Sequence, residues 1–375
     1  MRNSRFMERL LDGVEVEWLS LGDVTKYEQP NKYLVNSTNY NDDFDTPVLT
    51  AGKTFVLGYT NEISGIYKAS ESPVIIFDDF TTANKWVDFD FKAKSSAMKM
   101  VTSSDENKFL IKYIYYWLNT LPSELVDGDH KRQWIGNFAN KKIPIPPLHI
   151  QAEIVRILDA FTELTTELTT ELNARKKQYN YYRDQLLSFD EGDVEWKTLG
   201  EVAEIGTGCH DTQDAIEDGN YIFYARGREP LKLDVFDFDE TAIITAGDGA
   251  GVGKVFHYAQ GKYALHQRAY RIVPSENMEA RFVYHYIASY FYEYIQKASV
   301  SSSVTSLRKP MFLKFPIPVV SLAEQARIVA TLDKFDALIH SITDGLPREI
   351  ALRQQQYDYY RDLLLSFPKA GEADV

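Results

Sequence analysis

The sequence has little cysteine, no long apolar run and no excess of positive charge. Among 375 residues there is one cysteine, Cys209, so no disulfide can form within the chain. A lone cysteine fits a reducing cytoplasm. No apolar stretch reaches the roughly 18 residues that a membrane span needs. The N-terminal residues 1–11 contain Arg2 and Arg5 but no long apolar stretch after them, which argues against a secretory signal.

The charge balance argues against a simple nucleic-acid binder. The formal net charge is -13, whereas such proteins are usually basic. The charges are unevenly distributed, however: residues 81–142 hold ten Lys/Arg and seven Asp/Glu, and residues 251–315 hold nine and three. Residues 211–250 hold ten acids and three bases. Basic segments therefore lie within an acidic frame, a pattern that ordinary solvated surface explains as well as a binding surface does.

Catalytic motifs are also missing. The chain has no Asn/Asp-Pro-Pro-Phe/Tyr motif, which an adenine methyltransferase would need. Glu106-Asn107-Lys108 imitates part of a nuclease motif but lacks its Pro-Asp context. The glycine-rich run from Gly247 to Lys254 lacks the first glycine and the final Ser/Thr of a phosphate-binding loop, so a tight turn is expected there. The scattered histidines and one cysteine have no zinc-ligand spacing, and we expect no metal and no catalytic residue.

The strongest positive feature is an internal repeat. The pattern Val-Glu-Trp-x-x-Leu-Gly-x-Val occurs at residues 16–24 and 194–202. Gln-Tyr-x-Tyr-Tyr-Arg-Asp-x-Leu-Leu-Ser-Phe occurs at residues 178–189 and 356–367. Between these blocks, a Pro-Ile-Pro segment precedes a Gln-Ala-x-Ile-Val helix start in both halves, at Gln151 and at Gln325.

The inserts within this frame, residues 25–142 and 203–314, barely resemble each other. One weak correspondence pairs the following positions: Val74-Ile75-Ile76 with Ile243-Ile244-Thr245, Asp79 with Asp248, Lys85 with Lys254, and Lys99 with Arg268. Similar frames around dissimilar inserts predict one fold that is used on two different targets.

A long amphipathic helix is predicted after each insert. Apolar residues recur at steps of three and four from Ile154 to Leu186, with one gap, and from Ile328 to Leu364. Such a stripe is typical of a coiled coil, and each helix has the other as its natural antiparallel partner. The second stripe contains Asp344-Gly345-Leu346-Pro347, which predicts a break.

This organisation predicts an α+β protein. We expect two pseudo-symmetric globular domains of mixed α and β structure, joined by two long antiparallel coiled-coil helices. The predicted segments are a first domain at 1–147, a central helix at 148–190, a second domain at 191–320, a C-terminal helix at 321–367 and a tail at 368–375.

A shorter repeat lies inside the first predicted helix, where Thr-Glu-Leu-Thr recurs every four residues from Thr162 to Leu172. Strict four-residue spacing drifts away from a heptad seam, so neutral helical filler is one interpretation. The other is a length adjuster. Each added unit lengthens a helix by about 6 Å, which is the rise of about two DNA base pairs.

The repeated blocks resemble those of the specificity (S) subunits of type I DNA restriction-modification enzymes, and the Thr-Glu-Leu-Thr run resembles the helix repeat of the type IC group. The resemblance covers the whole chain. It implies two target recognition domains, each reading half of a bipartite site in double-stranded DNA. It also implies a bacterial cytoplasmic protein at the nucleoid, with two modification (M) subunits docked on the helices and restriction (R) subunits added. The S subunit would hold no cofactor, and S-adenosylmethionine, ATP and Mg would bind to the partner subunits.

Candidate DNA-binding residues in the first insert are basic, amide or aromatic side chains beside turn signals, because such groups suit base edges and phosphates. The strongest candidates are His130, Lys131, Arg132, Gln133 and Trp134, and the second choices are Asn84, Lys85, Trp86, Lys92, Lys94 and Lys99. A solvated turn is the alternative for residues 130–133, and core packing is the alternative for Trp134.

Candidates in the second insert lie in an aromatic, strand-like run and in a hydroxyl-rich stretch. Strand alternation would place His266, Arg268 and Tyr270 on one face. The candidates are Lys254, His266, Gln267, Arg268, Arg271, Ser302, Ser303, Thr305, Arg308 and Lys309. A flexible connector is the alternative for residues 301–309.

A different class of function stays open at this stage. The same two-headed, helical arrangement suits a coiled-coil scaffold with two protein-binding heads. The basic inserts favour DNA recognition over this alternative, because a scaffold has no need of them.

Overall fold

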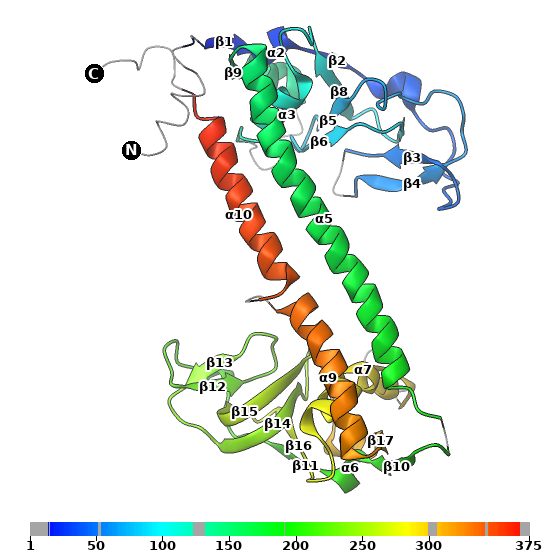
Figure 1. Ribbon diagram of the computed structural model, residues 1–375, viewed down its shortest axis with the longest axis vertical. Coiled ribbons are helices and arrows are strands. Elements are labelled where there is room, and N and C mark those ends of the chain that lie inside the picture. The colour runs from blue at the N-terminus through cyan, green and yellow to red at the C-terminus, as the bar shows by residue number, and fades with distance from the viewer. Residues whose placement is uncertain are drawn as a thin grey trace. The chain divides into compact units, whose positions relative to one another are not determined.

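The computed structural model describes residues 14, 16–51, 54–122, 132–190, 192–298, 306–341 and 344–367. The chain divides into two compact units (Figure 1). Unit 1 comprises Met1–Leu168 and Ile350–Val375, and unit 2 comprises Thr169–Glu349. Each unit combines sheets with helices, which confirms the predicted α+β class. Among the described residues, no helix is long and apolar enough to cross a membrane.

Unit 1 is built around a four-stranded sheet of order β2-β8-β5-β6, beside a three-stranded sheet of order β4-β3-β7. Helix α3 (Ile111–Leu118) and the first turns of α5 (Leu148–Leu186) share the main hydrophobic core with β5. The strands are β1 (Glu17–Ser20), β2 (Thr25–Glu28), β3 (Thr46–Leu49), β4 (Val56–Thr60), β5 (Val74–Asp78), β6 (Asn84–Val87), β7 (Lys92–Ala93), β8 (Met98–Ser103) and β9 (Lys142–Ile145). The short helices are α2 (Leu21–Val24), η1 (Pro30–Tyr33), α4 (Gln133–Gly136) and η2 (Phe138–Asn140).

Unit 2 contains a six-stranded sheet of order β11-β16-β14-β15-β12-β13. Helix α7 (Ala280–Ala298) packs on this sheet through aromatic side chains, among them Phe282 and Phe291. The strands are β10 (Glu195–Thr198), β11 (Ala203–Thr207), β12 (Tyr221–Tyr224), β13 (Leu231–Leu233), β14 (Phe238–Ala246), β15 (Phe256–Leu265), β16 (Ala269–Pro274) and β17 (Pro316–Val319). The short helices are α6 (Leu199–Val202), η3 (Thr212–Asp214) and α8 (Lys309–Leu313).

The repeated sequence blocks close each unit in the same way. In unit 1, β1 pairs antiparallel with β9, and Trp18 lies opposite Pro144. In unit 2, β10 pairs antiparallel with β17, and Trp196 lies opposite Pro318. Each pair is a separate two-stranded ribbon, so both of its strands are edge strands. Proline has no N–H to donate, and an edge strand is where a proline can lie without leaving a ladder hydrogen bond unmade. The entry and exit of each insert are therefore fastened to each other.

A buried glutamine fixes the start of the long helix in both units. Gln151 is fully buried; its Oε1 accepts from the Leu110 N–H (2.9 Å), and its Nε2 donates to the carbonyls of Lys108 and Pro146 (both 2.8 Å). Gln325 does the same in unit 2, accepting from the Glu279 N–H (2.7 Å) and donating to the carbonyls of Asn277 and Val320. The repeated Gln-Ala-x-Ile-Val block therefore satisfies backbone groups that would otherwise be buried without partners.

We expect Gln151→Ala to lower the free energy of unfolding of unit 1 by about 3 kcal/mol, because it leaves one N–H and two carbonyls unpaired in the core. Gln325→Ala should have an equal effect on unit 2. Chemical denaturation of the full chain checks both. Gln185→Ala is the matched control, because Gln185 is exposed and its side chain donates to a side chain, the Tyr181 hydroxyl, and not to buried backbone. A loss no larger than that of the control would contradict the role assigned to the two glutamines.

The long helices form as predicted. Helix α5 runs unbroken from Leu148 to Leu186, and the C-terminal stripe is divided into α9 (Leu322–His340) and α10 (Leu346–Leu364). The break coincides with Gly345, whose hypothetical Cβ would lie 2.6 Å from the Ala337 carbonyl oxygen. Ile342, part of the predicted stripe, lies outside the described residues.

Aromatic stacking marks the helix pairing within each unit. In unit 1, Phe161 of α5 stacks on Tyr360 of α10 at 5.2 Å, and the two helices run in opposite directions (Figure 1). In unit 2, Tyr182 of α5 stacks on Phe335 of α9 at 5.7 Å. The predicted helix pairing is thus confirmed, and its tyrosines come from the repeated Tyr-Tyr-Arg-Asp block.

Candidate nucleic-acid interface

Three equivalent strands support the candidate interface in each unit. In unit 1, β5 pairs with β8 and β8 pairs with β2. In unit 2, β14 pairs with β16 and β16 pairs with β11, again antiparallel. The weak correspondence between the inserts is confirmed at this point, because Asp79 forms an ion pair with Lys99 and Asp248 forms one with Arg268. Each aspartate lies just beyond the end of a buried strand.

In unit 2, Asp248 holds two arginines at the protein surface. Its Oδ1 accepts from Arg226 and its Oδ2 from Arg268, each at 3.0 Å. The side chain of Arg268 is 64% exposed. Burial alone would raise the pKa of Asp248, but the hydrogen bonds and charges of the two arginines outweigh burial and hold the pKa below its usual value. The carboxylate therefore stays ionised and orients two guanidinium groups, which are the side chains best suited to bidentate contact with guanine.

Two concave regions flank this pair. One is a cavity of about 620 Å³, lined by Thr212, Arg226, Arg228, Lys254 and residues 248–251, among others. The other, of about 300 Å³, is lined by Gly247, Asp248, Gln267, Arg268, Tyr270, Ser306 and Leu307. We call the surface that carries Arg226, Gln267, Arg268 and Ser306 the unit 2 reading edge.

Several predicted residues of unit 2 lie on or near this edge. Gln267 and Arg268 are exposed in the turn between β15 and β16, and Gln267 Nε2 donates to Asp211 at 3.0 Å. Arg308 and Lys309 are exposed where α8 begins. Lys254 is exposed and lies over the Tyr292 ring at 4.8 Å. Ser302, Ser303 and Thr305 lie outside the described residues.

Two other predicted residues of unit 2 have inward-facing roles, and we do not propose them as DNA contacts. His266 is 1% exposed, and its Nδ1 accepts the Arg268 N–H at 2.9 Å. Strand alternation failed for His266 because the chain turns there, as the Ala269 N–H bond to the His266 carbonyl shows. The Arg271 side chain is only 12% exposed and is enclosed by Glu204 and Glu240.

In unit 1, residues 132–136 fold over the corresponding aspartate and bury it. The backbone N–H of Gln133 bonds to the Asp79 carbonyl (2.8 Å), and that of Trp134 bonds to Asp79 Oδ1 (2.9 Å). Trp134 is 1% exposed and packs on Phe77 at 5.0 Å, so core packing is its role. Gln133 is also buried. The expectation that these two side chains face DNA is therefore corrected.

Lys99 is also internal. Its Nζ lies 3.4 Å from Asp79 Oδ2 and 5.0 Å from the centre of the Tyr27 ring, with no exposed area. Arg132 is its outer counterpart: the side chain is 51% exposed, and Nε lies 4.0 Å from the same carboxylate. Lys85 is exposed on β6, next to the half-buried Asn84. His130 and Lys131 lie outside the described residues.

Two arginines of the unit 2 reading edge, Arg226 and Arg228, were not among the predicted residues. Both lie in the loop between β12 and β13 and line the larger cavity. They were overlooked because residues 211–250 are acidic as a whole, and segment counts hide single cations. The available signal was the local Arg-Gly-Arg, two arginines around a turn-forming glycine just after an aromatic strand-like run.

The second-choice lysines differ in the same way. Lys94 is exposed, 5.9 Å from the centre of the Tyr40 ring. Lys92 is buried, and its Nζ bonds to Glu62 and to the Ser64 carbonyl, each at 2.7 Å. The hydrogen bond from Lys92 is the main cause that lowers the pKa of Glu62 from 4.5 to about 2. Lys92 is therefore a structural residue.

This pair predicts a pH-dependent stability. Because the pKa of Glu62 is lower in the folded chain, its ionised form stabilises unit 1 above about pH 4.5, and this contribution is lost as the pH falls toward 2. We expect Glu62→Gln to lower the melting temperature by several degrees at pH 7 and by progressively less below pH 4.5. Glu71→Gln, at an exposed position, is the control. An equal effect of Glu62→Gln at pH 7 and pH 3 would contradict the ionic role.

Comparison with known proteins identifies the family. A family model described as "Type I restriction modification DNA specificity domain" matches residues 13–177 and 191–352. The specificity subunit of the type I restriction enzyme EcoR124I/EcoR124II of Escherichia coli is 55% identical, and the match covers 98% of each chain. A putative type I specificity subunit of Haemophilus influenzae is 30% identical over 98% of this chain and all of its own. The crystal structure of a type I S subunit from M. genitalium shares the fold, with a TM-score of 0.70 at 16% identity over 96% of this chain and 98% of that one. The two matched regions coincide with the two halves of the internal repeat, and the chain belongs to the family of type I restriction-modification DNA specificity subunits.

Proposed function

We propose that this chain selects the DNA site for a type I restriction-modification complex, with each unit reading one half of a bipartite sequence. The observation that carries the proposal is the repeated frame around two dissimilar edges. In both units an aspartate beyond the end of a buried strand anchors a cation, which comes from the neighbouring strand β8 in unit 1 and from the turn just before the neighbouring strand β16 in unit 2. The residues around that anchor differ, as two unlike half-sites require.

The proposed contacts are exposed or half-exposed cations and amides near these anchors. In unit 2 they are Arg226, Arg228, Lys254, Gln267, Arg268, Arg308 and Lys309, and in unit 1 they are Asn84, Lys85 and Arg132. Arginine and glutamine suit guanine and adenine edges respectively, and lysine suits phosphates. The predicted residues outside the described part of the chain, His130, Lys131, Ser302, Ser303 and Thr305, stay in the proposal on the grounds of their chemistry alone.

We further propose that the long helices dock two M subunits, with R subunits joining them. The repeated Tyr-Tyr-Arg-Asp blocks support this docking. Tyr181 is 59% exposed and Tyr359 50% exposed, at equivalent positions of α5 and α10, so each helix presents the same aromatic feature. S-adenosylmethionine, ATP and Mg would then belong to the M and R subunits. The complex would work in the bacterial cytoplasm, at the nucleoid.

A gel-shift assay with the cognate M subunit at two salt concentrations tests the proposal. A DNA-reading subunit should give a sequence-specific complex that weakens steeply with salt, because phosphate contacts release counterions. Methylation mapping in cells that express both subunits should reveal one split motif. The rival function, a scaffold with two protein-binding heads, predicts no specific complex with any M partner.

A further inference from the structure

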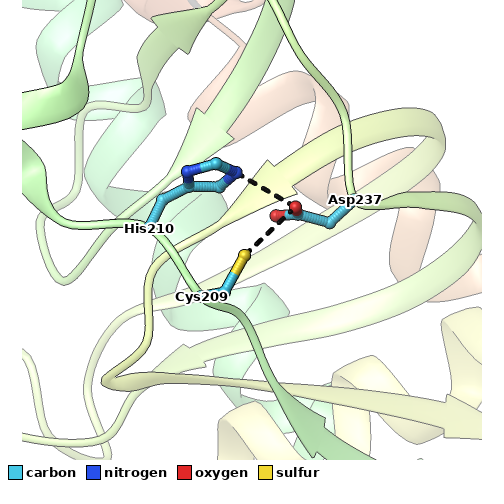
Figure 2. A group of neighbouring side chains, drawn as sticks. All are labelled: Cys209, His210 and Asp237. Atoms are coloured by element: carbon cyan, nitrogen blue, oxygen red, sulfur yellow. Dashed lines mark hydrogen bonds and ion pairs between the residues drawn. The ribbon is translucent and has the colours of Figure 1, made fainter.

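A thiol, an imidazole and a carboxylate meet at one place in unit 2 (Figure 2). Cys209 and His210 follow β11, and Asp237 precedes β14. His210 Nε2 lies 3.0 Å from Asp237 Oδ1, and Cys209 Sγ lies 3.5 Å from the same oxygen. All three potential ligand atoms lie within 4.8 Å of one another. We propose that Cys209, His210 and Asp237 form a binding site for a divalent transition metal of the zinc class.

The backbone holds the three side chains in position without a metal. Both segments are fastened to Leu265, whose N–H donates to Asp237 Oδ2 (2.8 Å) and whose carbonyl accepts the His210 N–H (3.3 Å). With Oδ2 engaged in this way, Oδ1 faces the imidazole and the thiol. A Cβ at Gly208 would lie 1.8 Å from the Leu265 carbonyl oxygen, so this close approach requires glycine immediately before Cys209.

The chemistry of the three ligands suits zinc. Zinc binds thiolate, imidazole and carboxylate at roughly 2.0 to 2.3 Å, usually in a tetrahedron. Tetrahedral ligand atoms at such bond lengths lie roughly 3.3 to 3.8 Å apart. The separations of Asp237 Oδ1 from His210 Nε2 (3.0 Å) and from Cys209 Sγ (3.5 Å) are close to this range, and the thiol and the imidazole lie within 4.8 Å of each other. Three protein ligands leave the fourth position of the tetrahedron open. Because Cys209 is exposed, solvent can reach the cluster.

Neighbouring groups also fit a metal site. Asp214 Oδ2 lies 3.8 Å from His210 Nδ1, the nitrogen that a metal on Nε2 would leave free. Carboxylates that accept a hydrogen bond from this nitrogen orient metal-bound histidines in many proteins, and a small side-chain movement would bring Asp214 to that distance. A cysteine binds a metal as the thiolate, so metal binding at Cys209 releases the thiol proton.

The site would steady the loop beside the unit 2 reading edge. This loop carries Asp211, which accepts the hydrogen bond from Gln267, and Thr212, which lines the cavity next to Arg226. The consequence for DNA reading rests on the proposed function, whereas metal binding itself does not.

Cobalt(II) titration of the full chain, in a non-thiol reductant, tests the site. Because Cys209 is the only cysteine, a thiolate-to-cobalt charge-transfer band can come from no other residue of the chain. We expect that band, the visible bands of tetrahedral cobalt, one ion per chain, and displacement by zinc. No band, or one ion per two chains, would overturn the proposal, since the latter indicates a thiol bridged between molecules.

Variants separate this site from a lone reactive thiol. Cys209→Ser should abolish the charge-transfer band, and His210→Gln and Asp237→Asn should each weaken cobalt binding by roughly tenfold or more. His340→Gln is the control, because His340 also contacts a carboxylate, that of Asp336, at 2.8 Å. A band unchanged in both His210→Gln and Asp237→Asn would refute the three-ligand site.

A measurement on the unaltered chain guards against misfolded variants. Zinc should slow alkylation of Cys209 by roughly tenfold or more, and a rate that does not change with zinc would also refute the site. If the unaltered chain gives the cobalt band but does not bind DNA together with the M subunit, the proposed function is contradicted and the metal site is not.

Discussion

Replacing Arg268 with alanine is expected to relax or abolish the reading of one half-site and to leave the other half-site unchanged. Arg268 is the more exposed of the two arginines that bind Asp248. It projects from a short turn, and the His266 imidazole holds the backbone of that turn by accepting the Arg268 N–H. Loss of one bidentate contact with a base costs about 1–3 kcal/mol, which corresponds to a fall in affinity of roughly fivefold to 150-fold. Methylation mapping in cells with the M partner reads both halves of the motif in one experiment.

Two further variants sharpen this test. Arg268→Lys keeps the positive charge but loses the guanidinium fork, so it should retain general DNA affinity and still lose discrimination. Arg132→Ala, in unit 1, should affect the opposite half-site. Equal losses at both halves in Arg268→Ala would show that the residue has a structural role.

Deleting Thr166-Glu167-Leu168-Thr169 is expected to shorten the spacer between the half-sites without changing either half. Helix α5 is unbroken and contributes residues to both units, so removing one repeat shortens their connection. Leu164, Leu168 and Leu172 are all half-buried, and Glu163, Glu167 and Glu171 are all exposed. The repeat is therefore equivalent from one copy to the next, and the deletion preserves the apolar stripe.

The size of the change follows from helix geometry. Four residues remove about 6 Å of length and leave a net rotation of about 40°. The length corresponds to about two base pairs, whereas the rotation is close to the twist of about one base pair. We therefore expect a spacer shorter by one or two base pairs in the methylated motif. Glu167→Gln keeps the helix length and should leave the spacer unchanged; an unchanged spacer in the deletion variant would refute the idea that α5 sets the spacing.

The sequence by itself determined the architecture, because that architecture depends on repetition and periodicity. The Val-Glu-Trp and Pro-Ile-Pro blocks became the ribbons β1–β9 and β10–β17, and the apolar stripes became α5, α9 and α10. The correspondence of Asp79 with Asp248 and of Lys99 with Arg268 was also visible, since equivalent strands keep equivalent positions.

Only the tertiary structure decided which candidate residues reach the surface. Lys99, Trp134 and His266 have the residue types of a DNA-binding surface, yet all three are buried. Lys99 lies against Asp79 and Tyr27, Trp134 packs on Phe77, and His266 faces inward in the turn between β15 and β16. Arg226 and Arg268 come together because both donate to the Asp248 carboxylate, which lies 22 residues after Arg226 in the chain. His210 and Asp237 are 27 residues apart, so local spacing predicted no metal ligands, although the end of β15 brings them together. Long-range pairing between strands sets these contacts, and single-sequence patterns do not encode it.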